Sequence, residues 1–270
     1  MIVIGIDIGG STTKIIGVNE SDGKTLEPMQ VKANDPITSV YGAFGRYISE
    51  HNIDLSTISK IKVTGVGSTY IKDDIYRIET LHVNEFTAIG LGGLKMSELS
   101  KAIIVSMGTG TSFVHADGTQ IYRMGGTGVG GGTLLGLSSL MLDISNFDSI
   151  VDIAKDGNLG NIDLSVGEMA TVNSYMSSNV TASNFGKVSD YANKSDIALG
   201  LINMVFQTVG MMSVFASRID DTKDVVLCGS LTTVPNTNEF FSIIEDLHDI
   251  KFHLPRHAEY ATALGAALSE

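Results

Sequence analysis

The chain has 270 residues and is 43% hydrophobic, enough to bury one large core or two linked half-domains. Its formal net charge of -12 argues against nucleic acid or an anionic membrane as a partner, because phosphate groups are bound by clustered Lys and Arg. The single cysteine, Cys228, excludes an internal disulfide framework and a thiolate-only metal site. No apolar run approaches the ~20 residues that cross a bilayer, and no basic leader precedes Asp7. We therefore expect a cytoplasmic protein that begins at Met1 and has no membrane span.

The first part of the chain predicts three antiparallel strands, a helix and a parallel strand. The strands are β-branched and apolar, and the Gly9-Gly10 and Asp22-Gly23 pairs suit tight turns between them. Apolar residues at helical spacing predict the helix that follows. The expected elements are strands at 2–8, 13–18 and 26–32, a helix at 37–50 and a strand at 61–64.

The second part repeats this order, with Asp117-Gly118 as its tight turn. The same order of elements thus occurs twice: a strand, a glycine loop, a second strand, an Asp-Gly turn and a third strand. This repeat predicts a duplicated fold with a pseudo-twofold axis between the two glycine loops. We place the lobes at 1–95 and 96–270. The expected elements are strands at 102–107, 111–116 and 119–124, helices at 132–142, 147–155 and 189–218, a strand and glycine loop at 225–230, and a helix, strand and helix at 240–247, 251–254 and 260–269.

Two loops rich in glycine and hydroxyl side chains each follow an apolar strand, one within 7–14 and the other at 108–112. Glycine lets main-chain N–H groups approach an anion, hydroxyls add donors, and Lys14 adds positive charge. Either loop alone could be a plain glycine hairpin. Together they predict a nucleotide held between the two halves.

Asp7 is a carboxylate within an otherwise apolar strand. Burial of an unpartnered carboxylate is unfavourable, so we expect Asp7 to face a polar group or a solvated metal. Mg²⁺ prefers one or two carboxylates together with phosphate oxygens, which favours Asp7 as its ligand, directly or through water. The alternative is a structural carboxylate that accepts hydrogen bonds from the turn.

A glycine run at 125–132 is the least ordinary stretch of the chain. It precedes an apolar helix, whose N-terminal N–H groups would favour a polyanion; a flexible hinge is the alternative. Arg123 stands beside the run and can bind a carboxylate in a bidentate manner, which suits an acidic small substrate. A surface ion pair is the alternative for Arg123.

Glu85 lies where a strand gives way to a helix. Phosphorylation of an alcohol requires a carboxylate near the hydroxyl, to accept its proton or to orient it. Glu85 is our candidate for this general base. A first-turn residue that stabilises the helix dipole is the alternative.

These motifs together resemble the actin-like superfamily of sugar kinases and chaperone ATPases, at 7–14, 108–112 and 225–230. More narrowly, the segments 83–86, 123–132, 181–186 and 261–266 resemble type II pantothenate kinase. That family converts pantothenate to 4′-phosphopantothenate with ATP and Mg²⁺, the first step towards coenzyme A. The resemblance implies an α/β, duplicated ribonuclease-H-like (actin-like ATPase) fold with two lobes around a nucleotide cleft. It also implies a homodimer, with 189–218 as the helical dimerisation segment.

The resemblance also implies site residues. Glu85 acts as the general base, Asp7 is the Mg²⁺ ligand, and Thr109, Ser112 and Arg123 hold pantothenate near the transferred phosphoryl group. The implied ATP-binding residues are Asp7, Ile8, Gly9, Gly10, Ser11, Thr12, Thr13, Lys14, Thr109, Gly131, Gly132, Thr133, Leu134, Leu135, Phe147 and Ser230.

Two rival functions fit part of the same pattern. One is a sugar or N-acetylhexosamine kinase on the same fold. The other is a nucleotide-dependent activase or switch, although activases that carry an iron–sulfur cluster need more cysteines than Cys228 alone.

Overall fold

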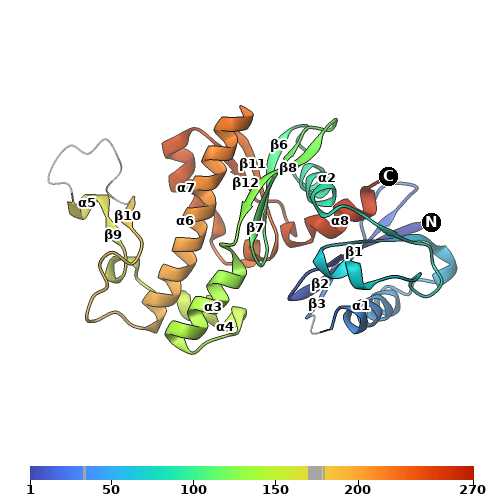
Figure 1. Cartoon of the computed structure of the whole chain (residues 1–270), viewed down its shortest axis with the longest axis horizontal. Coiled ribbons are helices and arrows are strands. Elements are labelled where there is room, and N and C mark those ends of the chain that lie inside the picture. Colours follow the sequence, from blue (N-terminus) through green and yellow to red (C-terminus); the bar gives the residue numbers. More distant parts are fainter. Residues whose placement is uncertain (33–34, 170–177, 179) are drawn as a thin grey trace.

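The computed structural model describes residues 1–32, 35–169, 178 and 180–270. They form two lobes, each built on a five-stranded mixed sheet (Figure 1). In the first sheet, β1 pairs antiparallel with β2 and parallel with β4. This confirms the predicted hairpin and the predicted parallel pairing. In sheet order the strands are β3 (Met29–Lys32), β2 (Thr12–Asn19), β1 (Ile2–Ile8), β4 (Ile58–Thr64) and β5 (Thr80–His82).

The second sheet repeats this connectivity, with β6 in the place of β1. In sheet order its strands are β12 (Lys251–His253), β11 (Asp224–Cys228), β6 (Ala102–Met107), β7 (Thr111–Ala116) and β8 (Ile121–Thr127). Gly65 and Gly229 follow the equivalent strands β4 and β11, with φ of 85° and 91°, values that favour glycine. The repeat confirms the predicted duplicated ribonuclease-H-like fold.

Helices cover both sheets and form a layer between them (Figure 1). The helices are α1 (Pro36–Glu50), α2 (Glu85–Ser97), α3 (Gly131–Leu142), α4 (Phe147–Ala154), α5 (Val166–Met169), α6 (Lys194–Asp220), α7 (Thr237–His248) and α8 (Ala261–Leu268). Helix α1 packs on one face of the first sheet, where Phe44 and Tyr47 are fully buried. Helices α3, α4, α6 and α7 cover the outer face of the second sheet, and a small antiparallel sheet of β9 (Leu164–Ser165) and β10 (Thr181–Ser183) lies beyond them.

Helices α2 and α8 cross between the lobes. Helix α2 follows the first sheet yet packs on the second, whereas α8 ends the chain and packs on the first. Their contact is close because a Cβ on Gly92 would lie 1.8 Å from the carbonyl oxygen of Ala261, and one on Gly265 would lie 1.7 Å from that of Ala88. The predicted division at 95 and 96 falls near the end of α2, between the two sheets.

Several element ends differ from the sequence predictions. Helix α6 begins at Lys194 rather than 189, because Asn193 and Asp196 form a capping box there. Strand β8 begins at Ile121 rather than 119. The Asp117 carboxylate accepts the N–H groups of Thr119 and Gln120, and these bonds hold both residues in the turn before the strand. Strand β3 begins at Met29 rather than 26, since Pro28 has no N–H to give to the ladder.

Helix α6 is also long and apolar enough to span a membrane, contrary to the expectation that no segment is. In its most apolar window, 61% of the residues are buried inside the protein, as in a core helix. It packs against α3, α4 and α7.

Candidate active site

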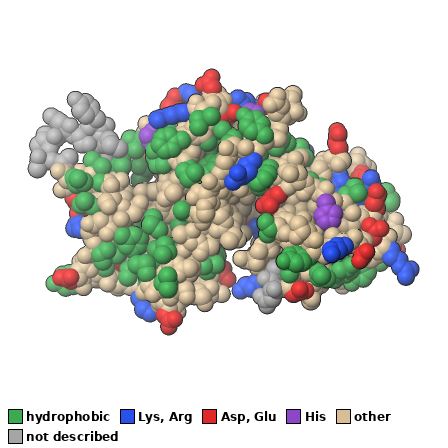
Figure 2. All heavy atoms as spheres, in the orientation of Figure 1, with side chains coloured by type: hydrophobic (Ala, Val, Ile, Leu, Met, Phe, Trp, Pro, Cys, Tyr) green, Lys and Arg blue, Asp and Glu red, His purple; other side chains and the backbone are tan. Residues whose placement is uncertain are grey.

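A cleft of about 860 Å³ lies between the two lobes. The hollow between them is visible in Figure 2. The turns that follow β1 and β6 meet across this cleft, because a Cβ on Gly10 would lie 3.9 Å from the hydroxyl oxygen of Thr109. The two glycine loops predicted to hold one nucleotide are therefore brought together.

Most of the predicted site residues line this cleft. They are Asp7, Gly9, Gly10, Ser11, Thr12, Lys14, Glu85, Thr109, Ser112, Arg123, Gly131, Gly132, Leu135, Phe147 and Ser230.

Four other predicted residues do not line the cleft. Ile8, Thr13 and Leu134 are buried in the protein core, at 0%, 0% and 1% exposure. Successive residues of a strand point to opposite faces, so only every second residue of β1 and β2 reaches the cleft. Ile8 and Thr13 point the other way, into the core. The hydroxyl of Thr133 donates to the carbonyl oxygen of Gly128 at 2.8 Å, which fixes the glycine run instead.

Asp7 and Lys14 face each other on the paired strands β1 and β2. Burial raises the pKa of Asp7 to about 6, with the nearby Glu85 adding to the rise and the Lys14 charge opposing it. Burial also lowers the pKa of Lys14, while the Asp7 charge acts in the other direction. Lys14 Nζ donates a 2.9 Å hydrogen bond to the hydroxyl of Ser230, in the opposite lobe.

Glu85 is the first residue of α2 and lines the cleft. The side chain of Asn84 caps this helix by accepting the N–H groups of Phe86 and Thr87 at 2.9 and 3.2 Å. Burial raises the pKa of Glu85. A carboxylate held at a capped helix start, with raised basicity, has the properties that a general base requires.

The glycine run packs against the turn that follows β6. Gly131 N and Gly132 N donate 2.8 Å hydrogen bonds to the carbonyl oxygens of Gly108 and Thr109. A Cβ on Gly130 would lie 2.8 Å from that same Thr109 oxygen. Two of the N–H groups at the start of α3, which the sequence predicted to face a polyanion, are thus bonded within the protein. The glycines allow close packing here and do not form an isolated hinge.

Further residues line the cleft without having been predicted. Gly65 and Val66 follow β4 as Gly229 and Ser230 follow β11, so the internal repeat was a signal that could have found them. The others include Gln30, Lys32, Ser106, Asn146, Asp148, Thr233 and Thr262.

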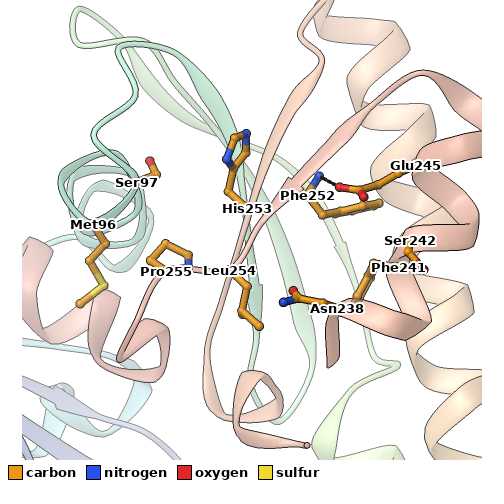
Figure 3. A pocket seen from close by; sticks show the side chains of 10 residues that line it. All are labelled: Met96, Ser97, Asn238, Phe241, Ser242, Glu245, Phe252, His253, Leu254 and Pro255. Atoms are coloured by element: carbon orange, nitrogen blue, oxygen red, sulfur yellow. Dashed lines mark hydrogen bonds between the residues drawn. The ribbon is translucent and has the colours of Figure 1, made fainter. Parts of the chain in front are cut away.

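A second cavity, of about 440 Å³, lies between α2, α7 and β12 (Figure 3). Two of its lining residues are bonded within the protein: Phe252 N donates to Glu245 Oε1 at 2.5 Å, and His253 Nε2 lies 2.6 Å from Asp224 Oδ1. None of the predicted site residues lines this cavity.

The segment 181–186, one of those that resemble type II pantothenate kinase, has a structural role. The buried Asp163 accepts the N–H of Phe185 at 2.8 Å and the side-chain amide of Asn203, on α6, at 2.7 Å. Gln207, also on α6, donates to the Thr181 hydroxyl at 2.7 Å. These bonds fasten the segment to α6.

Comparisons with known proteins agree with this architecture. The Fumble family model matches residues 69–269. A type II pantothenate kinase from Bacillus thuringiensis subsp. konkukian (strain 97-27) is 30% identical over 279 aligned residues, which cover 98% of this chain and 96% of that relative.

Solved structures extend the likeness at the level of the fold. The activator of the 2-hydroxyisocaproyl-CoA dehydratase from Clostridium difficile, with bound ADPNP, gives a TM-score of 0.70 at 17% identity, covering 99% of this chain and 93% of that one. A ROK family glucokinase from Streptomyces griseus, in complex with glucose and AMPPNP, gives 0.62 at 12% identity, covering 99% and 98%. At these identities the likeness shows the shared fold alone.

Proposed function

The chain belongs to the Fumble family, that of the type II pantothenate kinases, and from this premise we propose that its interlobe cleft is where phosphoryl transfer takes place. The protein is an ATP-dependent pantothenate kinase of coenzyme A biosynthesis. The observation that supports the placement is the meeting of both glycine loops in one cleft that also holds Glu85 and Arg123.

ATP binds with its phosphates against the turns after β1 and β6, where Ser11, Thr12 and Thr109 offer hydroxyls and Lys14 offers positive charge. Leu135, Phe147 and Ser230 line the nucleotide side of the cleft.

Asp7 fits the role of Mg²⁺ ligand, directly or through water. It lines the cleft, its pKa is raised to about 6, and a cation beside it would offset the cost of its burial. The described residues hold no cluster of three acidic, His or Cys side chains suited to a metal, so phosphate oxygens would complete the coordination. When bound, Mg²⁺ neutralises charge on the transferred phosphoryl group.

The acceptor alcohol lies beside Glu85, which takes its proton as the hydroxyl oxygen attacks the γ-phosphorus and ADP leaves. The carboxylate of pantothenate meets Arg123, and Ser112 contacts the substrate between these two ends. Arg suits this role because its planar guanidinium matches a carboxylate.

We further propose that the protein is a cytoplasmic homodimer that does not bind membranes. Hydrophobic side chains gather over α6 on the face shown in Figure 2. Phe215 and Ile219, one helical turn apart on α6, are 54% and 81% exposed, and an apolar helix face of this kind suits a subunit interface.

A coupled assay of ADP release tests the function. With Mg²⁺ and ATP, we expect turnover that depends on pantothenate and is absent with glucose or N-acetylglucosamine. Transfer of a γ-³²P label to pantothenate is the direct readout. Label transfer to a sugar alone would indicate the sugar-kinase alternative, and ADP release without an acceptor would indicate an activase-like ATPase.

A further inference from the structure

The Arg123 guanidinium lies against an aromatic ring. Its Cζ is 5.4 Å from the ring centroid of Phe86, the residue that follows Glu85 in the first turn of α2. Among the residues that the structure describes, no acidic side chain lies within ion-pair distance of Arg123. The guanidinium is therefore held by packing, and its N–H donors are left for a ligand.

A β-bulge brings Arg123 to this position. The pairing of β7 with β8 shifts between Phe113 and Val114, so that Ser112 faces Gly126 while Val114 faces Arg123. Residues 112 and 114 share one face of β7, and the extra residue in β8 puts Arg123 and Gly126 on one face as well. Without the bulge, these two residues would lie on opposite faces.

Gly126 leaves room for the guanidinium. A Cβ at this position would lie 2.8 Å from Arg123 Nη2 and 2.8 Å from the carbonyl oxygen of Thr111. Arg123 thus contacts the Phe86 ring and the bare backbone of β8, in a cleft that Ser112 and Glu85 also line.

We propose that Phe86 is a positioning residue for the acidic end of the substrate: its ring holds the Arg123 guanidinium where the substrate carboxylate binds. The inference rests on the proposed function, in which Arg123 is the carboxylate clamp. Because Glu85 and Phe86 are consecutive residues of one capped helical turn, the base for the hydroxyl and the support for the clamp are fixed relative to each other. This turn then sets the distance between the two ends of an accepted substrate.

Phe86→Leu tests the proposal, since leucine preserves apolar contact with the cluster around Ile89 and Val114 but removes the ring face. We expect the KM for pantothenate to rise by a factor of about two to five, as for loss of a partly exposed cation–π contact. The kcat and the KM for ATP should stay at wild-type values. Phe86→Tyr is the matched control and should restore the KM.

A double-mutant cycle with Arg123→Ala completes the test. Once Arg123 is absent, Phe86→Leu should add nothing to the KM for pantothenate. Independent, multiplying effects would overturn the positioning role, as would a KM unchanged in Phe86→Leu while Arg123→Ala raises it. If Arg123→Ala itself leaves the KM unchanged, the clamp fails, and the inference fails with it for that separate reason.

Discussion

Lys14 Nζ donates a 2.9 Å hydrogen bond to the Ser230 hydroxyl, and this bond joins the two lobes across the cleft. Lys14 lies on β2, opposite Asp7 on β1, whereas Ser230 begins the short 3₁₀ helix after β11. Lys14 as a whole is only 5% exposed. A buried cation that touches both lobes and opposes an acidic group is well placed to sense and to bind the phosphates of a nucleotide.

Replacement of Lys14 should change the pH dependence of catalysis. The Lys14 charge lowers the pKa of Asp7, so Lys14→Met should raise that pKa above its present value of about 6. The acid limb of the kcat/KM profile should then move to higher pH. At pH 7, kcat/KM should fall by about 10²-fold, as for loss of one charge-stabilising donor.

Ser230→Ala is the control for this prediction. It removes the partner of the hydrogen bond but leaves the Lys14 charge, so the acid limb should stay in place. An acid limb that is unmoved in Lys14→Met would show that Asp7 does not set it.

Glu85→Gln should separate chemistry from binding. Gln keeps the size of the side chain but cannot accept the proton of the acceptor hydroxyl, so kcat should fall by about 10²- to 10⁴-fold. Calorimetry should find ATP affinity close to that of the wild type. Glu79→Gln, at a carboxylate that is 58% exposed and paired with Lys60, should leave kcat unchanged. Near-normal turnover in Glu85→Gln would remove Glu85 from the role of base.

Asp7→Asn should stabilise the ligand-free protein while it abolishes activity. Because the folded pKa of about 6 lies above the ordinary value of 3.8, the folded state binds the proton more tightly than the unfolded state does. Stability is therefore lost as the pH rises from 3.8 to about 6, and the charged side chain remains unfavourable at pH 7. With allowance for its partial exposure, the gain for Asn at pH 7 should be about 1–2 kcal/mol.

Urea unfolding without nucleotide or Mg²⁺ measures this effect. The advantage of Asp7→Asn should shrink as the pH falls below the folded pKa and disappear near pH 3.8, where the wild-type carboxyl group is itself largely protonated. A variant less stable than the wild type at pH 7 would show that the carboxylate has a stabilising partner in the free protein.

The sequence predicted those parts of the site that depend on local order. Strand, glycine turn and strand place Asp7 near Lys14 by hairpin geometry, and the repeated pattern predicted the second loop with Thr109. It did not separate Thr13, which faces the core, from Lys14, which faces the cleft, because a strand buried on both faces has no polar alternation to show its orientation.

Contacts that depend on tertiary packing could not be predicted from local sequence patterns. The bulge in β8 has no sequence signature that fixes its position within the run after Arg123, so the meeting of Arg123 with Phe86 could not be derived. The crossing of α2 and α8 depends likewise on residues far apart in sequence, Gly92 and Gly265. Neither glycine stands out in the sequence, because glycine is required at each position only by the backbone of the opposing helix.

Gly265→Ala should destabilise the protein strongly through this crossing. The new Cβ would lie 1.7 Å from the carbonyl oxygen of Ala88, so α8 must move away from α2. We expect the free energy of unfolding to fall by about 3 kcal/mol or more. The matched control is Gly42→Ala, in α1, where nothing lies within 4 Å of the added Cβ. It should raise stability by up to about 1 kcal/mol. Equal stability of the two variants in urea unfolding would contradict the close crossing.

Charge introduced on the exposed face of α6 should dissociate the proposed homodimer. Ile219→Lys combined with Phe215→Lys would bury unpaired charge of one sign in an apolar interface, which opposes association. Light scattering coupled to size-exclusion chromatography should give twice the chain mass of 28.6 kDa for the wild type and a single chain mass for the variant. Ile37→Glu, on α1 and 46% exposed, is the control and should stay dimeric. A wild-type protein that is monomeric at micromolar concentration, or a variant that remains dimeric, would exclude α6 as the subunit interface.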